Sequence, residues 1–302
     1  AMGNFSGANV QHDSQANGCW PVLIKHGTPA FGLPFLDENA ELTVEKTGLT
    51  IQLKDGSKRI PELNSQFAQV LMQSIFDSVR YHFATRRHGV APAPVDTDVV
   101  RQKIIRLVDA YVERLNNYLP YYSPIQAVRS SEYFQVYYQA SQDQFTIKGL
   151  ALEYQLSDEW ISFRMLSDGT KRMMFILAEI FAPEEVRFNE STNEVTISLR
   201  QKIILLEEPE LGIHPHQLHL LLNLIREVSR EHQVIMTTHS PQVLDMLSEK
   251  ELDRITICSL DPKKGTQFRK LSRAKQAQAR RYMKEELHLS DYWRYSYLED
   301  EE

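Results

Sequence analysis

The stretch KIILLEEPELGIHPHQLHLLLNLIREVSREHQVIMTTHS, residues 202–240 of this 302-residue chain, decides the fold. Its apolar run at 203–206 shows no polar alternation, which is typical of a parallel strand buried on both faces. A helical pattern follows, and a second apolar run at 233–236 predicts another buried strand. A strand–helix–strand unit of this length predicts a right-handed βαβ crossover in an α/β sheet.

Polar side chains follow both predicted strands. Glu207 and Glu208 end the first strand, and His239 and Ser240 follow the second. Because the carboxyl ends of parallel strands share one sheet edge, where open α/β sheets place ligands, these groups are expected to converge. One carboxylate could hold Mg²⁺, and its neighbour could polarise a water for phosphoryl transfer. The alternative is a solvated acidic turn beside an ordinary strand-end histidine.

A second polar group stands at the start of an apolar helix. Ser167, Asp168 and Gly169 precede a pattern in which Met173 and Ile180 belong to one apolar face. The free N–H groups and the dipole at the beginning of a helix make a site for an anion. Taken alone, the same residues form an ordinary helix start.

In this order, LSDGTKR, IILLEEPELGIHP and VIMTTHSPQVLD resemble the carboxyl-terminal half of an ABC-type ATPase head. The resemblance is to the SMC/RecF-like branch and to OLD-like AAA ATPases of bacterial phage-defence systems such as Septu, PARIS and retrons. It is close over about 161–247 and looser towards the end, at ELHLSDYW. It implies an α/β, SMC-like P-loop NTPase head with a mixed or parallel sheet, an antiparallel β-layer and an inserted helical hairpin.

The resemblance also implies roles for individual residues, with ATP and Mg²⁺ as cofactors. Glu207 matches the Walker B carboxylate on the metal side, Glu208 the catalytic base and His239 the switch histidine. Residues 210–215 occupy the D-loop region. Residues 166–169 match the signature motif, which would touch the γ-phosphate held by a partner subunit. The nucleotide contacts implied on this signature side are Ser167, Asp168, Gly169, Lys171 and Arg172.

The phosphate-gripping Walker A loop, G-x-x-x-x-G-K-[ST], is missing from this sequence. The nearest match, at 27–34, has Leu33 and Pro34 where lysine and Ser/Thr are required, and Pro29 removes a backbone donor. The start, Ala1-Met2-Gly3, resembles the scar of a cleaved tag, so native sequence is expected upstream. A degenerate loop and a fold kept only as a scaffold are the alternatives.

The spacing of apolar residues along the chain predicts three parts. Residues 1–61 alternate as strands and turns and form an amino-terminal, β-rich part of the ATPase lobe. Residues 62–120 carry apolar positions at helical spacing, among them Leu71, Ile75 and Val79, and predict an inserted helical hairpin. Residues 121–302 hold the three motifs and end in a basic helical segment.

Charge and cysteine content narrow the function classes. The net charge of −6 gives no global basic field for nucleic acid. Nine lysines and arginines within 263–284 predict either a DNA contact or a solvated helix face. Cys19 and Cys258 follow no metal or redox spacing, which favours a reduced, cytoplasmic protein. No apolar run approaches about 18 residues, so no membrane helix is expected.

These observations predict an ATPase head that forms a homodimer or higher oligomer around ATP. It would hydrolyse ATP between heads and regulate a separate effector in antiphage defence. Without a phosphate-gripping loop, the chain alone is expected to be inactive. The alternatives are a catalytically incomplete binding or scaffold module and a RecF-like DNA-repair clamp. The three histidines at 214, 216 and 219 do not share one helix face, which argues against a zinc site, and His214 is assigned to the D-loop region.

Overall fold

The predicted strand–helix–strand unit forms the centre of a parallel sheet. Strand β12 (Lys202–Glu207), helix α5 (Pro215–Val228) and strand β13 (Gln233–Thr237) follow one another. Strand β12 pairs in parallel with β13 on one side and with β1 (Trp20–Ile24) on the other, in the order β1-β12-β13. The computed structural model describes residues 20–24, 41–45, 48–52, 58–59, 66–84, 95–131, 133–189, 191–285 and 288–296. The sequence match to a phosphate loop at 27–34, and Cys19, lie outside these residues.

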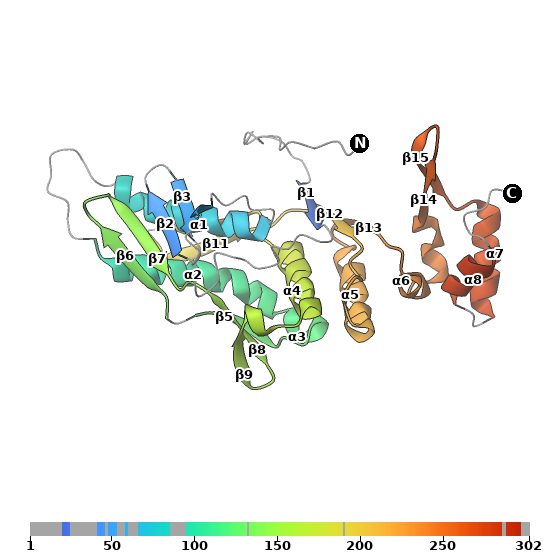
Figure 1. Ribbon diagram of the computed structural model, residues 1–302, viewed down its shortest axis with the longest axis horizontal. Helices are drawn as coiled ribbons and strands as arrows, with labels where there is room; N and C mark the ends of the chain where they lie inside the picture. The colour runs from blue at the N-terminus through green and yellow to red at the C-terminus, as the bar shows by residue number, and fades with distance from the viewer. Residues whose placement is uncertain are drawn as a thin grey trace.

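Burial in this sheet differs between its strands. Ile204 and Leu206 of β12 are fully buried and share one core with residues of helices α4 (Asp168–Phe181) and α5, which lie beside the sheet (Figure 1). The prediction that 233–236 forms a second buried strand is wrong, since Ile235 of β13 is 49% exposed. Among the described strands β13 pairs only with β12, and Ile235 lies on the opposite face of the sheet from Ile204 and Leu206.

Antiparallel strands form the predicted β-layer. A five-stranded sheet has the order β4-β3-β2-β7-β6, and a three-stranded sheet has the order β5-β8-β9. The strands of the larger sheet are β2 (Glu41–Glu45), β3 (Gly48–Gln52), β4 (Lys58–Arg59), β6 (Gln135–Gln139) and β7 (Gln144–Lys148). The smaller sheet consists of β5 (Ala127–Ser130), β8 (Leu152–Leu156) and β9 (Glu159–Ser162). The predicted hairpin before β12 is β10 (Glu185–Asn189) with β11 (Glu194–Ser198).

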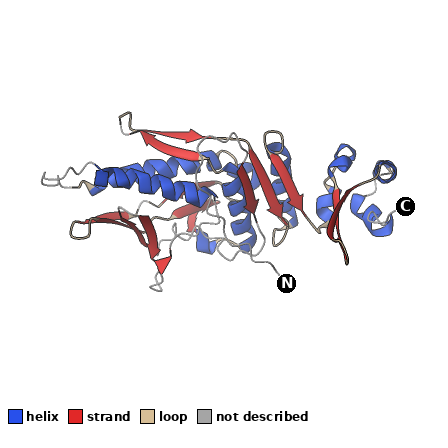
Figure 2. Cartoon of the chain, turned by 90° about the horizontal axis from the view of Figure 1, so that it is seen from above, coloured by secondary structure: helices blue, strands red, loops and turns tan. Residues whose placement is uncertain are grey.

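Two long helices, α1 (Gln66–Ala84) and α2 (Thr97–Asn116), lie side by side next to these sheets (Figure 2). The four-residue spacing predicted their contact face, since Leu71, Ile75 and Val79 are completely buried. These residues belong to the same core as the parallel sheet and α4. The helical pair is therefore packed onto the same core as the parallel sheet. Short helices α3 (Leu119–Tyr122) and η2 (Phe163–Met165) connect the elements that follow.

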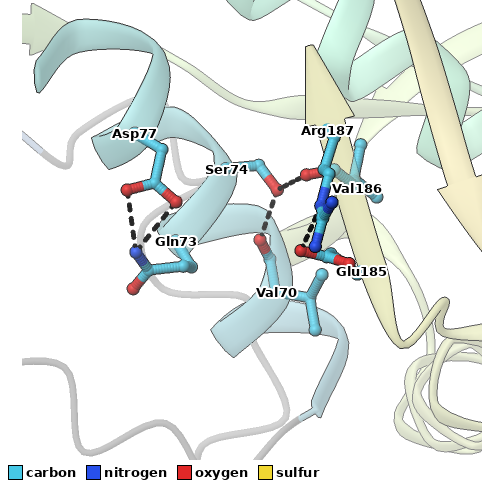
Figure 3. Close-up of polar contacts among 7 residues, drawn as sticks. All are labelled: Val70, Gln73, Ser74, Asp77, Glu185, Val186 and Arg187. Carbon is cyan, nitrogen blue, oxygen red and sulfur yellow. Dashed lines mark hydrogen bonds and ion pairs between the residues drawn. The ribbon is translucent and has the colours of Figure 1, made fainter. Parts of the chain in front are cut away.

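A buried serine ties the first long helix to the β10–β11 hairpin (Figure 3). The Ser74 hydroxyl lies 2.7 Å from the carbonyl oxygen of Val70 in its own helix and 3.1 Å from that of Val186 in β10. Such a bond satisfies a polar group in a region closed to water. It fixes α1 against the segment that leads into β12.

The carboxyl-terminal residues form a lobe at the end of the molecule opposite the long helices (Figure 1). Its elements are α6 (Pro241–Asp245), η3 (Glu249–Arg254), β14 (Thr256–Asp261), β15 (Gly265–Lys270), α7 (Arg273–Lys284) and α8 (Leu289–Ser296). The predicted hairpin with its turn at 262–265 is confirmed. A small separate core unites the lobe, and Asp245 of α6 accepts hydrogen bonds from the amide and hydroxyl of Ser290.

The architecture confirms the predicted α/β class, with a parallel sheet, antiparallel layers and a helical pair. No helix in the described part of the chain combines the length and hydropathy needed to cross a bilayer.

Candidate functional site

The polar groups at the ends of β12 and β13 come together as predicted. Glu207 is paired in register with Thr237, and the Glu208 amide donates a 3.0 Å hydrogen bond to the Thr237 carbonyl. Just beyond, the Nε2 of His239 lies 3.5 Å from Oε1 of Glu208. The His239 side chain is 89% exposed, so its other ring nitrogen faces solvent at the edge of the sheet.

Glu208 has an uncommon backbone conformation. Its φ of +42° lies in the left-handed region, which residues other than glycine rarely adopt. The Glu208 carbonyl accepts a hydrogen bond from the Leu211 amide, which closes a tight turn directly after the strand. Such conformations persist only where surrounding contacts enforce them, and they concentrate at functional sites. The turn directs the Glu208 carboxylate towards His239.

Arg172 of helix α4 helps to hold Glu208 in this backbone conformation. Its Nη2 donates to the carbonyl of Glu208 at 2.5 Å and to that of Glu207 at 3.3 Å. Burial lowers the pKa of Arg172, and the carboxylates of Glu210 and Glu208 oppose that shift. The resemblance predicted Arg172 as a nucleotide contact. In the structure, its guanidinium contacts the backbone at the end of β12 in the same chain.

The beginning of α4 packs against the loop that follows β12. A Cβ on Gly169 would lie 2.6 Å from the carbonyl oxygen of Gly212, closer than real Cβ atoms approach. Only glycine fits this position without movement. Ser167 is the N-cap of α4 and accepts a 3.2 Å hydrogen bond from the Thr170 amide. The predicted signature residues and the D-loop region are thus neighbours in one chain.

The remaining signature residues lie on the outer side of the same helix turn. The Lys171 Nζ is 3.3 Å from Oδ1 of Asp168, whose side chain is fully exposed. The Lys171 side chain is 24% exposed. Because water surrounds the Asp168 carboxylate, the pair contributes little to stability, and this carboxylate is available to other groups at the start of α4.

A further network joins the loops after the two strands, and the sequence did not reveal it. The Thr238 hydroxyl donates to Oε1 of Glu210 at 2.5 Å and accepts from the Ser240 amide at 2.9 Å. The other carboxylate oxygen of Glu210 is buried and has no hydrogen-bond partner. The only signal was a threonine directly before His239. The network fixes the segment that carries His239.

The residues present can supply one carboxylate ligand to a magnesium ion that is also held by a nucleotide. Glu207 is an exposed carboxylate at the strand tip, and Mg²⁺ in phosphoryl-transfer proteins is held by one or two carboxylates together with phosphates and water. Within the described residues no three His, Cys, Asp or Glu side chains are grouped to hold a metal alone. His214 caps α5 by accepting from the His216 amide, which supports a structural role for this histidine.

Comparison with known proteins adds the family. Residues 78–245, more than half of the chain, match the family described as "AAA domain, putative AbiEii toxin, Type IV TA system". The matched segment runs from α1 through the start of α4 to the residues beyond His239. The chain belongs to this AAA family. The predicted relationship to AAA ATPase heads is therefore confirmed, and domains of this AAA family generally use ATP and Mg²⁺.

Individual relatives match shorter parts. The Septu protein PtuA of Bacillus thuringiensis is 29% identical over 92 residues, 30% of this chain and 23% of its own length. An uncharacterized protein of Methanocaldococcus jannaschii is 29% identical over 68 residues, 22% of this chain and 17% of its own length. The chain thus spans less than a quarter of either relative.

Solved structures of SMC heads are similar as well. The Smc head domain with a coiled coil and joint from Pyrococcus yayanosii is 15% identical, with a TM-score of 0.36 over 62% of this chain and 31% of that chain. A structure from work on ATP-driven dimerization of SMC ATPases is 16% identical, with a TM-score of 0.37 over 63% of this chain and 96% of that chain.

Proposed function

We propose that this protein is an ATPase whose heads bind ATP and Mg²⁺ between subunits, hydrolyse ATP and thereby control a separate effector in the cytoplasm. The observation that carries the proposal is the meeting of Glu208 and His239, 3.5 Å apart, at the carboxyl edge of a parallel sheet. Ligands of open α/β sheets bind at this edge. A structural role alone gives no reason to keep an acid and a histidine together there.

Each residue has a chemical task in this proposal. Mg²⁺, held through Glu207, would neutralise charge on the phosphates. Glu208 would accept a proton from the attacking water as general base, with its carboxylate held in place by the turn at φ +42°. His239 would donate a hydrogen bond to the γ-phosphate from the nitrogen that faces solvent. Arg172 would position Glu208 through the backbone carbonyl.

The signature residues are assigned to nucleotide held by a partner subunit. Ser167 and Gly169 begin a helix of 14 residues, whose amino end favours an anion. Asp168 and Lys171 are the charged groups next to that end. The proposed site also requires a phosphate-gripping loop, and no G-x-x-x-x-G-K-[ST] motif occurs in the 302 residues. The isolated chain is accordingly proposed to be inactive.

The defence role rests on the family description and on one relative, the Septu protein PtuA. The contacts of the basic segment argue against the rival DNA-clamp function. The Nζ of Lys270 donates to the carbonyls of Asp253 and Arg254, and Nε of Arg280 donates to that of Glu249. These side chains hold β15 and α7 to η3, which reduces the continuous basic surface that DNA would need.

ATP turnover by the full-length native protein tests this proposal. Glu208→Gln keeps the size of the side chain but removes the base, and should lower kcat by about 100-fold or more. Glu231→Gln, at an exposed position after α5, is the matched control and should leave turnover unchanged. If the wild type is as inactive as Glu208→Gln under assembly conditions, the protein is a nucleotide-binding or scaffold module instead.

A further inference from the structure

The β14–β15 hairpin has an outer face that the small carboxyl-terminal core does not use. The register pairs Cys258 with Phe268 and Leu260 with Thr266, so these side chains lie on one face. Ile257, on the opposite face, packs against the core of the lobe. The outer face consists of Thr256, Cys258, Leu260, Thr266, Phe268 and Lys270.

Two large apolar side chains on this face are exposed to solvent. Leu260 is 79% exposed and Phe268 is 73% exposed. They occupy diagonal positions across the two strands, close enough to touch one partner group together. Cys258, also exposed, lies directly opposite Phe268. Single exposed apolar residues are ordinary, whereas a cluster on one ribbon face marks an interaction surface.

The hairpin is also open along its edges. It is a two-stranded sheet, and no other described strand pairs with β14 or β15. It projects from the lobe at the end of the molecule (Figure 1). An isolated ribbon of this kind is stabilised when its apolar face is covered.

Lysines border the apolar cluster. Lys263 and Lys264 stand at the turn, where both amides donate to the carboxylate of Asp261 at 2.7 and 2.8 Å. These bonds lower the pKa of Asp261 and engage the one carboxylate of the hairpin in its own turn. A complementary surface therefore has an apolar centre and carboxylates around it.

We propose that the outer face of the β14–β15 hairpin docks a protein partner that presents an apolar pocket rimmed by carboxylates. A protein fits better than nucleic acid because a leucine side chain offers no surface for base stacking. In addition, Lys270 and Arg280 from the basic segment are engaged with carbonyls of their own chain. The proposal deepens the proposed function, since the partner would be the effector that the ATPase regulates, but docking itself needs no nucleotide.

The experiment selects peptides from a displayed library of random short sequences on the full chain, without ATP. Peptides that combine acidic with aromatic or aliphatic residues are expected to be enriched. Leu260→Ser with Phe268→Ser should weaken their binding at least about tenfold, since burial of one such side chain contributes that much. Leu156→Ser, at a 40% exposed leucine of β8, is the matched control and should bind like the wild type.

A second variant and a footprint locate the contact. Lys263→Glu with Lys264→Glu changes only the exposed turn and should remove the acidic preference. In a Cys19→Ser background, bound peptide should slow alkylation of Cys258. Failure to enrich acidic-apolar peptides, or unchanged binding in the serine variant, overturns the proposal. Salt-dependent binding of labelled DNA that the serine variant loses would also overturn it, in favour of nucleic acid. None of these readouts depends on ATP turnover, so either proposal can fail alone.

Discussion

The guanidinium of Arg172 in helix α4 donates a 2.5 Å hydrogen bond to the backbone carbonyl of Glu208 at the end of β12. The bond joins the predicted signature helix to the predicted catalytic residue within one chain. It reaches the backbone rather than the carboxylate, so it fixes the turn and leaves the side chain of Glu208 free to act. The position of α4 and the conformation of Glu208 are therefore linked.

Replacement of Arg172 by methionine should loosen that turn. The loss of two carbonyl contacts at a half-exposed guanidinium is expected to lower the free energy of unfolding by about 1 kcal/mol. Amide hydrogen exchange of the peptide covering 208–211 should become faster than in the wild type. The exposed Arg281→Met in α7 serves as control and should change neither quantity. Unchanged exchange at 208–211 would mean that Arg172 does not hold the turn.

Gly169→Ala should destabilise the chain more than its half-buried position in a first helical turn suggests. The new Cβ would lie 2.6 Å from the carbonyl of Gly212, so α4 or the loop must move, at a cost of about 1–3 kcal/mol. Chemical denaturation measures the loss. Asp168→Ala, with a fully exposed side chain beside it, should cost less than about 1 kcal/mol. Equal effects of the two substitutions would contradict the close packing.

The sequence allowed prediction of the elements but not of the contacts between their ends. Apolar runs and turn residues predicted β12, α5, β13 and the two hairpins because these signals are local. The bond from Arg172 to Glu208 and the one from Thr238 to Glu210 depend on how separate segments meet in space. The apolar run of β13 also could not show that Ile235 is half exposed, because exposure depends on the position of the strand in the sheet.

Glu208→Gly should make the chain more stable while it removes activity. Glycine adopts a φ of +42° without the steric cost that a glutamate carries, which is about 1 kcal/mol. The midpoint of urea unfolding should therefore rise. Asn193→Gly is a matched control in the β10–β11 turn, where φ is +58°, and should gain less because asparagine tolerates this region. A lower midpoint for Glu208→Gly would show that its side chain stabilises the fold.

Lys202 creates a pH dependence of stability at the other end of β12. Its buried Nζ lies within hydrogen-bonding distance of three carbonyls at the end of α4, those of Glu179, Ile180 and Ala182. Burial, together with the charge of Arg114, lowers the pKa of Lys202 to about 8 from its ordinary value of 10.5, while Glu179 opposes the shift. The unfolded chain therefore binds more protons than the folded chain between these two pH values. By linkage, stability rises with pH across that window.

Lys202→Met should remove this rise. The difference between a pKa of about 8 and one of 10.5 corresponds to roughly 3 kcal/mol at full deprotonation, most of it gained above pH 8. Urea unfolding from about pH 7.5 to 9.5 measures the free energy of unfolding of the wild type and the variant. The wild type should become more stable relative to the variant as pH rises. Tyr111 and Tyr154, whose pKa values burial raises, are present in both proteins and their effects cancel. Lys264→Met, at an exposed turn, should follow the wild type. A stability difference between wild type and Lys202→Met that is constant with pH would mean that Lys202 titrates alike in the folded and unfolded chain.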